Sequence, residues 1–426
     1  MAPADAAAER TLEELAPGAV RAADEADAID GARPRWIVEP DTAEAMAAVL
    51  AWASAHRQPV VLRGGGTHLA WGRRPADVGL VVSTRRLNRL IRYEPGDLTV
   101  SVEAGMSIDA LNGDLARHGQ WLPIDAASDA STVGGAIATN DSGPLRHKYG
   151  TPRDQIIGVR LATADGRLAS AGGQVVKNVA GYDLGKLVAG SFGAFGGIVS
   201  ATFKLAPIPA TSATLVASFD EGNRMVGAAA LLAGSQLDPM CLDAEARAGR
   251  EPRARLLVRF GGTAAPVAEQ IAAAAAMARS TGSTTTETFE GEAEFRLWRE
   301  RVAVLAGSDR GTTVRASWMP AALPAVLALL ARVAHEGHLD VIFNGRAGVG
   351  AGIIRIDGEP VARATGVARL REASDTLGHV VVTDAGADAK ERMDVWGPPL
   401  PSAAISAALK RALDPAGVLN AGRGPV

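Results

Sequence analysis

The chain has 426 residues, of which 47% are hydrophobic and 21% are charged, and its formal net charge is −3. This balance excludes a strongly basic nucleic-acid-binding protein, and no apolar run is long enough to span a bilayer. A chain of this length is expected to form two or three domains. Because the first residues are acidic and lack a basic segment followed by an apolar core, we expect no signal peptide and a cytoplasmic location.

The cysteine and glycine contents narrow the chemistry further. Cys241 is the only cysteine, which excludes an intrachain disulfide, a redox pair and an iron–sulfur cluster held by cysteines of this chain alone. A small buried side chain is the expected role of Cys241. The 48 glycines cluster between residues 64 and 200, so the backbone shape of this region is expected to matter.

The first region, which ends near Pro209, alternates helices and strands. Its expected elements are a helix at 42–55 with Asp41 as a possible cap, strands at 79–83 and 98–103, a helix near 108–119 and a hairpin turn at Asp165–Gly166.

The glycine loop Gly64–Gly66 is the most informative stretch of this region. It follows an apolar strand at 59–62 and Arg63. Glycines adopt positive φ readily, and successive amides that point inward form a nest for anions such as a pyrophosphate. The spacing matches neither the Rossmann nor the P-loop motif. For three glycines alone, a flexible surface loop is the alternative.

From residue 213 onward, a repeated order of strands and helices replaces this pattern. The expected strands lie at 215–219, 255–260, 313–318, 340–343, 353–356 and 379–383, and the expected helices at 222–233, 267–279, 323–335 and 361–376. Two βαββαβ-like passages suggest a pair of ferredoxin-like folds that share one sheet and form a cap. The stretch 289–304 between them receives no assignment.

Four blocks of sequence follow one another in a recognisable order: RGGGTH at 63–68, ASTVGGAIATNDSGP at 130–144, VVKNVAGYDLGKLVAGSFGAFGGI at 175–198 and DPAGVLNAGR at 414–423. Together they resemble the FAD-linked oxidases of the vanillyl-alcohol-oxidase type and, among these, the FAD-binding small subunits of bacterial glycolate oxidases. The resemblance implies an α+β fold. It places a two-part FAD-binding domain of the PCMH type at 1–209, a ferredoxin-like cap domain at 210–385 and a C-terminal segment that returns to the FAD domain at 386–426.

The resemblance also implies the residues that hold FAD. The pyrophosphate would lie against the backbone of Arg63, Gly64, Gly65, Gly66, Thr67 and His68, and the ribityl and phosphate portion against Thr132, Gly134 and Gly135. The isoalloxazine would lie near Thr139, Asn140 and Gly143, the adenine near Ile198, and the C-terminal turn with Asn420 and Arg423 would approach the flavin. A helix cap at Ser131 or Thr132 is compatible with this role, and a plain C-cap is the alternative for Asn420.

Attachment of the cofactor is expected to be non-covalent. Some relatives link FAD to a histidine in their glycine loop, and Thr67 stands at the matching position here, with His68 one residue later. A hydroxyl group does not form the histidyl link.

The substrate side departs from the family pattern. Catalytic relatives carry an H-x-G-D-G-N-x-H motif in the cap, and the nearest match here, at 344–352, has neither histidine nor aspartate. Lys177, Asn178 and Arg346 are the substrate-side candidates, and Lys177 or Arg346 could hold a carboxylate. A structural role, with Asp183 capping the helix that follows it and Lys177 paired to that carboxylate, is equally open.

No metal site is expected. His335 and His338 lie where a helix ends and a strand begins, which favours an ordinary interaction with the helix C-terminus.

The resemblance implies an FAD-binding subunit of a glycolate (2-hydroxyacid) oxidase complex. The expected partners are a larger FAD subunit and an iron–sulfur subunit, the substrate is a small 2-hydroxyacid, and any membrane association would be peripheral, through these partners. The alternatives are a self-sufficient FAD-dependent D-2-hydroxyacid dehydrogenase and, from another class, a flavin-free structural scaffold.

Overall fold

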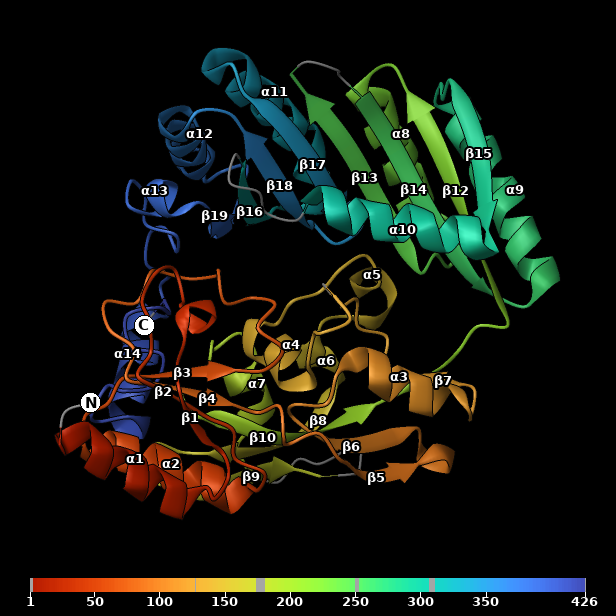
Figure 1. Ribbon diagram of the computed structural model, residues 1–426. Helices are drawn as coiled ribbons and strands as arrows, with labels where there is room; N and C mark the ends of the chain where they lie inside the picture. Colours follow the sequence, from red (N-terminus) through yellow and green to blue (C-terminus); the bar gives the residue numbers. More distant parts are fainter. Residues whose placement is uncertain (1–2, 127, 174–180, 250–252, 306–310, 426) are drawn as a thin grey trace. The chain divides into compact units, whose positions relative to one another are not determined.

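The computed structural model describes residues 3–126, 128–173, 181–249, 253–305 and 311–425 (Figure 1). Contacts divide the chain into two compact units. The first unit contains Met1–Gly143, Gly150–Ile208 and Pro398–Val426, and the second contains Pro144–Tyr149 and Pro209–Gly397. The second unit therefore takes up a short stretch that the sequence assigns to the FAD domain, and it extends past residue 385.

A four-stranded sheet opens the first unit, in the order β1-β2-β4-β3. The strands are β1 (Val20–Ala22), β2 (Trp36–Val38), β4 (Leu80–Ser83) and β3 (Val60–Arg63), and the last three run parallel. Helix α2 (Ala43–Ala55) joins β2 to β3, and α1 (Pro3–Leu15) packs beside α2. Apolar side chains of α1, α2 and the strands form one buried cluster. This cluster includes Val60 of β3, the strand from which the glycine loop starts.

The cap of α2 differs from the expected one. The side chain of Thr42, not that of Asp41, accepts a hydrogen bond from the amide of Ala45 at 3.1 Å. Thr42 has the extended backbone that an N-cap requires, so the prediction was wrong by one residue.

A five-stranded antiparallel sheet forms the other part of the first unit, in the order β5-β6-β10-β8-β9. Its strands are β5 (Leu90–Glu94), β6 (Thr99–Glu103), β10 (Gly197–Lys204), β8 (Ile156–Ala162) and β9 (Leu168–Gly172). The hairpin predicted at Asp165–Gly166 joins β8 to β9. The short elements around this sheet are α3 (Ile108–Ala116), β7 (Gln120–Trp121), α4 (Val133–Thr139), α6 (Pro152–Gln155), α7 (Leu184–Val188) and β11 (Ala206–Pro207), with β7 and β11 paired to each other.

The C-terminal tail belongs to the first unit. After α14 (Ala403–Leu413) the chain runs beside β3, where the amide of Val60 donates to Val418 and the amide of Asn420 donates to Val60. The tail therefore extends the four-stranded sheet next to the strand that leads into the glycine loop.

The second unit is built on an eight-stranded antiparallel sheet in the order β15-β12-β14-β13-β17-β18-β16-β19. Its strands are β12 (Thr211–Phe219), β13 (Cys241–Ala248), β14 (Arg253–Gly262), β15 (Thr285–Glu290), β16 (Gly311–Ser317), β17 (Asp340–Arg346), β18 (Ala351–Asp357) and β19 (His379–Ala385). Each half has the strand order 4-1-3-2 of a ferredoxin-like fold, and β13 pairs with β17 at the centre. The predicted ferredoxin-like pair is confirmed.

The two faces of this sheet differ in character. One carries the apolar core with α8 (Gly222–Ala233), α9 (Ala264–Ser280), α11 (Leu323–Gly337) and α12 (Pro360–Glu372). Alternate residues such as Thr214 and Asp243 point to the other face, where α10 (Gly291–Leu305) lies (Figure 1). Two further short helices, α5 (Arg146–Tyr149) and α13 (Ala387–Lys390), complete the unit.

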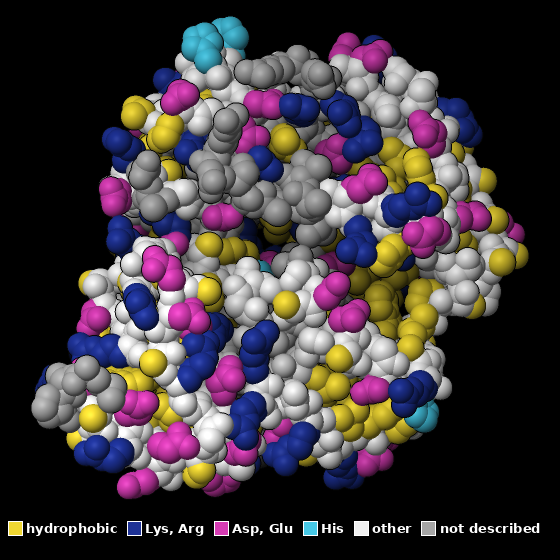
Figure 2. All heavy atoms as spheres, viewed as in Figure 1, with side chains coloured by type: hydrophobic (Ala, Val, Ile, Leu, Met, Phe, Trp, Pro, Cys, Tyr) yellow, Lys and Arg dark blue, Asp and Glu magenta, His cyan; other side chains and the backbone are white. Residues whose placement is uncertain are grey.

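The sequence did not predict β13, β15 or α10. In residues 291–301, the part of α10 whose side chains the structure describes, the buried residues are Glu294 and Arg301, and Leu297 and Trp298 are partly covered. This part of the helix therefore shows no buried apolar stripe. Strand β15 is polar at every position except Phe289. It therefore lacks the alternation of hydrophobic and polar residues by which a strand is predicted. On the face shown in Figure 2, acidic and basic side chains are interspersed on both units, in line with the small net charge.

Candidate functional site

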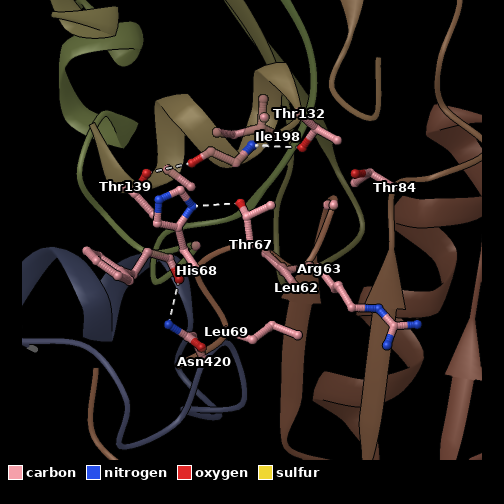
Figure 3. Close-up of a pocket in the computed structure, with 18 of the residues that line it drawn as sticks. Leu62, Arg63, Thr67, His68, Leu69, Thr84, Thr132, Thr139, Ile198 and Asn420 are labelled. Carbon is pink, nitrogen blue, oxygen red and sulfur yellow. Dashed lines mark hydrogen bonds between the residues drawn. The ribbon is translucent and has the colours of Figure 1, made fainter. Parts of the chain in front are cut away.

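A pocket in the first unit gathers most of the predicted cofactor residues. The empty space in and around it amounts to about 760 Å³, which includes solvent at its open mouth. Its described lining residues are Met46, Leu62, Arg63, Gly64, Gly65, Gly66, Thr67, His68, Leu69, Thr84, Thr132, Gly134, Gly135, Ala138, Thr139, Phe192, Gly193, Gly196, Ile198, Asn420 and Arg423. Figure 3 shows how several of these side chains converge from β3, α4, β10 and the C-terminal tail.

The three glycines of the loop serve two different purposes. Only Gly66 has a positive φ, of 82°. A Cβ on Gly64 would lie 2.1 Å from Oγ1 of Thr132, and one on Gly65 would lie 1.6 Å from the carbonyl oxygen of Ala130. Positive φ is therefore confined to the last glycine, while the first two glycines allow the loop to touch the segment before α4.

Helix α4 forms the facing wall. Thr132 caps it by accepting a hydrogen bond from the amide of Gly135 at 3.3 Å, and Oγ1 of Thr139 donates to the carbonyl of Gly135 at 2.9 Å. Gly134 lies against Ala104, where a Cβ would approach to 2.8 Å. The cap role considered for Thr132 is thus present at the pocket wall.

Arg63 contributes its backbone to the pocket, because its side chain is engaged elsewhere. Its guanidinium donates to Asp27 at 3.0 Å and points away from the other labelled residues in Figure 3. Arg21 donates to the same carboxylate at 2.6 and 2.8 Å. Hydrogen bonds from Arg21, then from the amide of Asp24 and from Arg63, hold the pKa of Asp27 well below its ordinary value. This ion pair fixes the end of β3.

A hydrogen-bonded chain runs along another side of the loop. Oγ1 of Thr67 lies 2.9 Å from Nδ1 of His68, and Nε2 of His68 lies 3.1 Å from Oδ2 of Asp141. The rings of Trp71 and His68 meet in a T-shaped arrangement, with a centroid distance of 4.2 Å. The His68 ring is therefore held on three sides.

The C-terminal tail closes the pocket beneath the glycine loop. The side-chain amide of Asn420 donates to the carbonyl of Phe192 at 2.6 Å, and a guanidinium nitrogen of Arg423 donates to the carbonyl of Trp71 at 2.8 Å. Asn420 has a φ of 49° and lies beyond the end of α14, so the simple helix-cap interpretation does not describe it.

A partly buried lysine, Lys410, secures this tail. Nζ of Lys410 donates to the carboxylate of Asp414 and to the carbonyl of Leu419, each at 2.6 Å, and to the carbonyl of Ala194 at 3.0 Å. The same carboxylate accepts the amides of Val418 and Leu419. Burial lowers the pKa of Lys410.

Several predicted site residues lie elsewhere. Asn140 ends α4 in the left-handed conformation, and its side chain accepts the amide of Arg153 at 3.1 Å. Gly143 packs against Asp125. Neither residue is among the described lining of the pocket. Lys177 and Asn178 fall outside the described residues.

The polar cluster around Asp183 has a structural component. Its carboxylate caps α7 by accepting the amide of Lys186 at 3.0 Å, and it forms an ion pair with the Lys186 side chain, also at 3.0 Å. Among the described residues, Asp183 therefore pairs with Lys186, whereas the expected partner Lys177 lies outside them.

The sequence missed eight lining residues: Met46, Leu62, Leu69, Thr84, Ala138, Phe192, Gly193 and Gly196. The last three belong to the SFGAFGG block and all have positive φ, a conformation that the glycine-rich pattern hinted at. Met46 is an ordinary core position of α2 in the sequence, and nothing in its spacing singles it out.

Arg346 lies in the second unit, on the polar face of the sheet. It is buried in β17, opposite Asp243 of β13. Arg301 of α10 reaches the same place and contacts Asp243, at 3.2 Å, and Asn344.

Burial lowers the pKa of His147 on α5, whose ring lies near Gly348. Over the described residues, no group of three or more His, Cys, Asp or Glu side chains could hold a metal ion.

The lining suits a cofactor that carries a pyrophosphate. None of the described lining residues is acidic, whereas Arg63, His68 and Arg423 are basic. A Cβ on Gly66 would meet only Leu69 within 4 Å, so there is open space beside the last glycine of the loop. Backbone amides and hydroxyl groups can donate hydrogen bonds to a diphosphate.

Comparison with known proteins agrees with this geometry. Residues 34–172 match the FAD binding domain family. Glycolate oxidase subunit GlcD of Bacillus subtilis (strain 168) is 35% identical over 189 residues, which cover 44% of this chain and 40% of the relative. D-lactate dehydrogenase of Archaeoglobus fulgidus is 36% identical over 171 residues, 40% of this chain and 38% of the relative. The matched part thus spans about two fifths of these relatives.

A solved structure extends the likeness to the whole fold. Alkyldihydroxyacetonephosphate synthase superposes with a TM-score of 0.73 at 15% sequence identity, covering 99% of this chain and 85% of that protein. The expected fold class, a two-part FAD-binding domain with a ferredoxin-like cap, is confirmed. In the part of the chain that the structure describes, no helix is long and apolar enough to cross a membrane. This chain therefore contains an FAD binding domain, is similar to FAD-linked oxidoreductases, and has FAD as its cofactor.

Proposed function

We propose that this protein is an FAD-dependent oxidoreductase subunit that takes part in the oxidation of a small 2-hydroxyacid such as glycolate. The observation that carries the proposal is the pocket, in which the glycine loop and α4 come together and whose described lining contains no acidic residue. The names of its relatives support the substrate class: glycolate oxidase subunit, D-lactate dehydrogenase and D-2-hydroxyglutarate dehydrogenase.

The roles of the pocket residues follow from their positions. The amides of Gly64–Gly66 and the hydroxyls of Thr67 and Thr132 would hold the phosphates, and Ile198 would cover the adenine portion. When bound, FAD supplies a two-electron acceptor for the hydrogen on the α-carbon of the hydroxyacid. The flavin-free scaffold considered from the sequence does not fit a chain whose cofactor is FAD.

The second unit supports a role beside a partner. Oxidation of a hydroxyacid needs a cation on the carboxylate and a base near the hydroxyl proton. Arg346 is the candidate cation, whereas residues 344–352 offer neither histidine nor aspartate. We therefore assign this chain to a complex with a larger FAD subunit and an iron–sulfur subunit. This chain has a single cysteine and cannot hold an iron–sulfur cluster by itself. The iron–sulfur subunit would therefore receive the two electrons removed from the hydroxyacid.

An anaerobic titration tests this proposal. The isolated, FAD-loaded chain should show little bleaching of its flavin when glycolate or D-lactate is added. Co-purification from the native host should identify the partner chains, and restoring them should allow bleaching. Rapid bleaching of the isolated chain would instead favour a self-sufficient D-2-hydroxyacid dehydrogenase. Absence of bleaching in both preparations would overturn the 2-hydroxyacid assignment.

A further inference from the structure

The chain Asp141–His68–Thr67 links an ionised side chain to a hydroxyl group of the FAD pocket. Thr67 and His68 line the pocket, whereas Asp141 lies behind them. The His68 and Asp141 side chains are only 11% and 18% exposed, so solvent competes weakly with their contact. Both ring nitrogens of His68 have a hydrogen-bond partner. The protonation state of the ring therefore determines whether the hydroxyl of Thr67 donates to Nδ1 or accepts from it.

The direction of each hydrogen bond follows from the donor inventory. An ionised carboxylate only accepts, so Nε2–H of His68 must donate to Asp141. In the neutral ring, Nδ1 is then an acceptor and takes the hydroxyl proton of Thr67. In the imidazolium, Nδ1–H donates to Oγ1 of Thr67 instead, and the hydroxyl proton is free to point into the pocket.

A diphosphate accepts hydrogen bonds and donates none. It is therefore matched by the second arrangement, in which His68 carries a positive charge and Thr67 donates into the pocket. The carboxylate of Asp141 stabilises that charge. Among the lining residues that the structure describes, the other ionisable groups are Arg63, whose side chain is paired with Asp27, and Arg423, which donates to main-chain carbonyls. Because both arginines are engaged in these contacts, the positive charge on His68 is the one that this proposal uses for the diphosphate.

We propose that Asp141 is a positioning residue of the FAD site, which acts through His68 to turn the hydroxyl of Thr67 into a donor toward the cofactor phosphates. Binding of FAD then takes up a proton at His68. The proposal rests on the cofactor and not on the proposed 2-hydroxyacid activity.

The test is the dissociation constant of FAD for the full chain, measured by flavin fluorescence between about pH 5.5 and 8.5. The wild-type constant should rise with pH, by up to about tenfold per pH unit where one proton is linked to binding. Asp141→Asn should weaken FAD binding by about tenfold near pH 6 and flatten the profile. His68→Gln should also flatten it. Asp109→Asn, an equivalent change on an exposed carboxylate of α3, should leave the profile unchanged.

Two further measurements separate this role from general stability. Thr67→Ser keeps the hydroxyl and should retain the pH dependence, whereas Thr67→Val should lose it. In NMR spectra, the imidazole of His68, assigned with His68→Gln, should show a doubly protonated ring when FAD is bound near neutral pH. A pH-independent constant in the wild type, or an unchanged slope in folded His68→Gln, would overturn the proposal.

Discussion

The α-carbon of Gly65 faces the carbonyl of Ala130 so closely that a Cβ on Gly65 would lie 1.6 Å from that oxygen. The two residues belong to different blocks of the sequence and meet at the wall of the pocket in the first unit. Backbone atoms cannot rotate away as a flexible side chain can, so the loop and the segment before α4 fit together only when residue 65 is glycine.

Replacing Gly65 with alanine should therefore separate the loop from residue 130. We expect loss of FAD binding and a decrease of about 2 kcal/mol in the free energy of unfolding. Gly113→Ala is the control, because a Cβ there meets nothing within 4 Å and alanine favours the helix. Chemical denaturation and the flavin absorption spectrum report both quantities. A Gly65→Ala protein with wild-type stability and flavin content would show that this contact is not required.

The ion pair between Asp27 and its two arginines should appear as acid sensitivity. The folded-state pKa of Asp27 lies below its unfolded value, so its contribution is present above about pH 3.9 and is lost as the pH falls below that value. Asp27→Asn should thus lower stability at pH 6 and reduce the loss of stability between about pH 4 and 2.5. Thermal unfolding across this range measures both effects. Parallel profiles for the two proteins would contradict the prediction.

Removing the buried cation of the tail should loosen the floor of the pocket. The side chains of Lys410 and Asp414 are 14% and 0% exposed, so Lys410→Met leaves an uncompensated carboxylate. We expect destabilisation by about 3 kcal/mol and weaker FAD binding, because Asn420 and Arg423 follow directly. Arg411→Met, on an exposed position of the same helix, should have little effect. Equal stability of the two variants would argue against this role.

Denaturation of the protein should release the flavin as unmodified FAD, because we expect no covalent link. Thr67 stands where some relatives carry the linking histidine, and both nitrogens of the adjacent His68 are engaged in hydrogen bonds. Heat or acid followed by filtration should release all of the flavin as FAD. Fluorescence that stays with the protein band on a denaturing gel would reveal a covalent link, with His68 as the first residue to examine.

Local patterning predicted much of this fold because most elements carry their own signal. The helix at 222–233 was predicted with the bounds of α8, and the hairpin at Asp165–Gly166 was located by its turn residues. Helix α10 escaped because its buried face is held by Glu294, which accepts from Thr214 and Arg259, and by Arg301. In the sequence, a buried helix face made of charged residues cannot be distinguished from a solvent-exposed one.

The site was predictable to the extent that its residues lie in recognisable blocks. The glycine loop, Thr132 and Asn420 all line the pocket as expected. Asn140 and Gly143 share a block with lining residues but turn away, because Asn140 ends α4 in the left-handed conformation. Asp141 lies in the same block, but no local pattern predicts its role, since its contact with His68 joins residues 73 positions apart.

A crystal structure of the chain with FAD tests the central claim most directly. Our account predicts cofactor density in the pocket of the first unit, with the pyrophosphate against the amides of Gly64–Gly66 and the side chain of Arg63 still paired with Asp27. Stoichiometric FAD bound elsewhere, or a pyrophosphate away from the glycine loop, would contradict it.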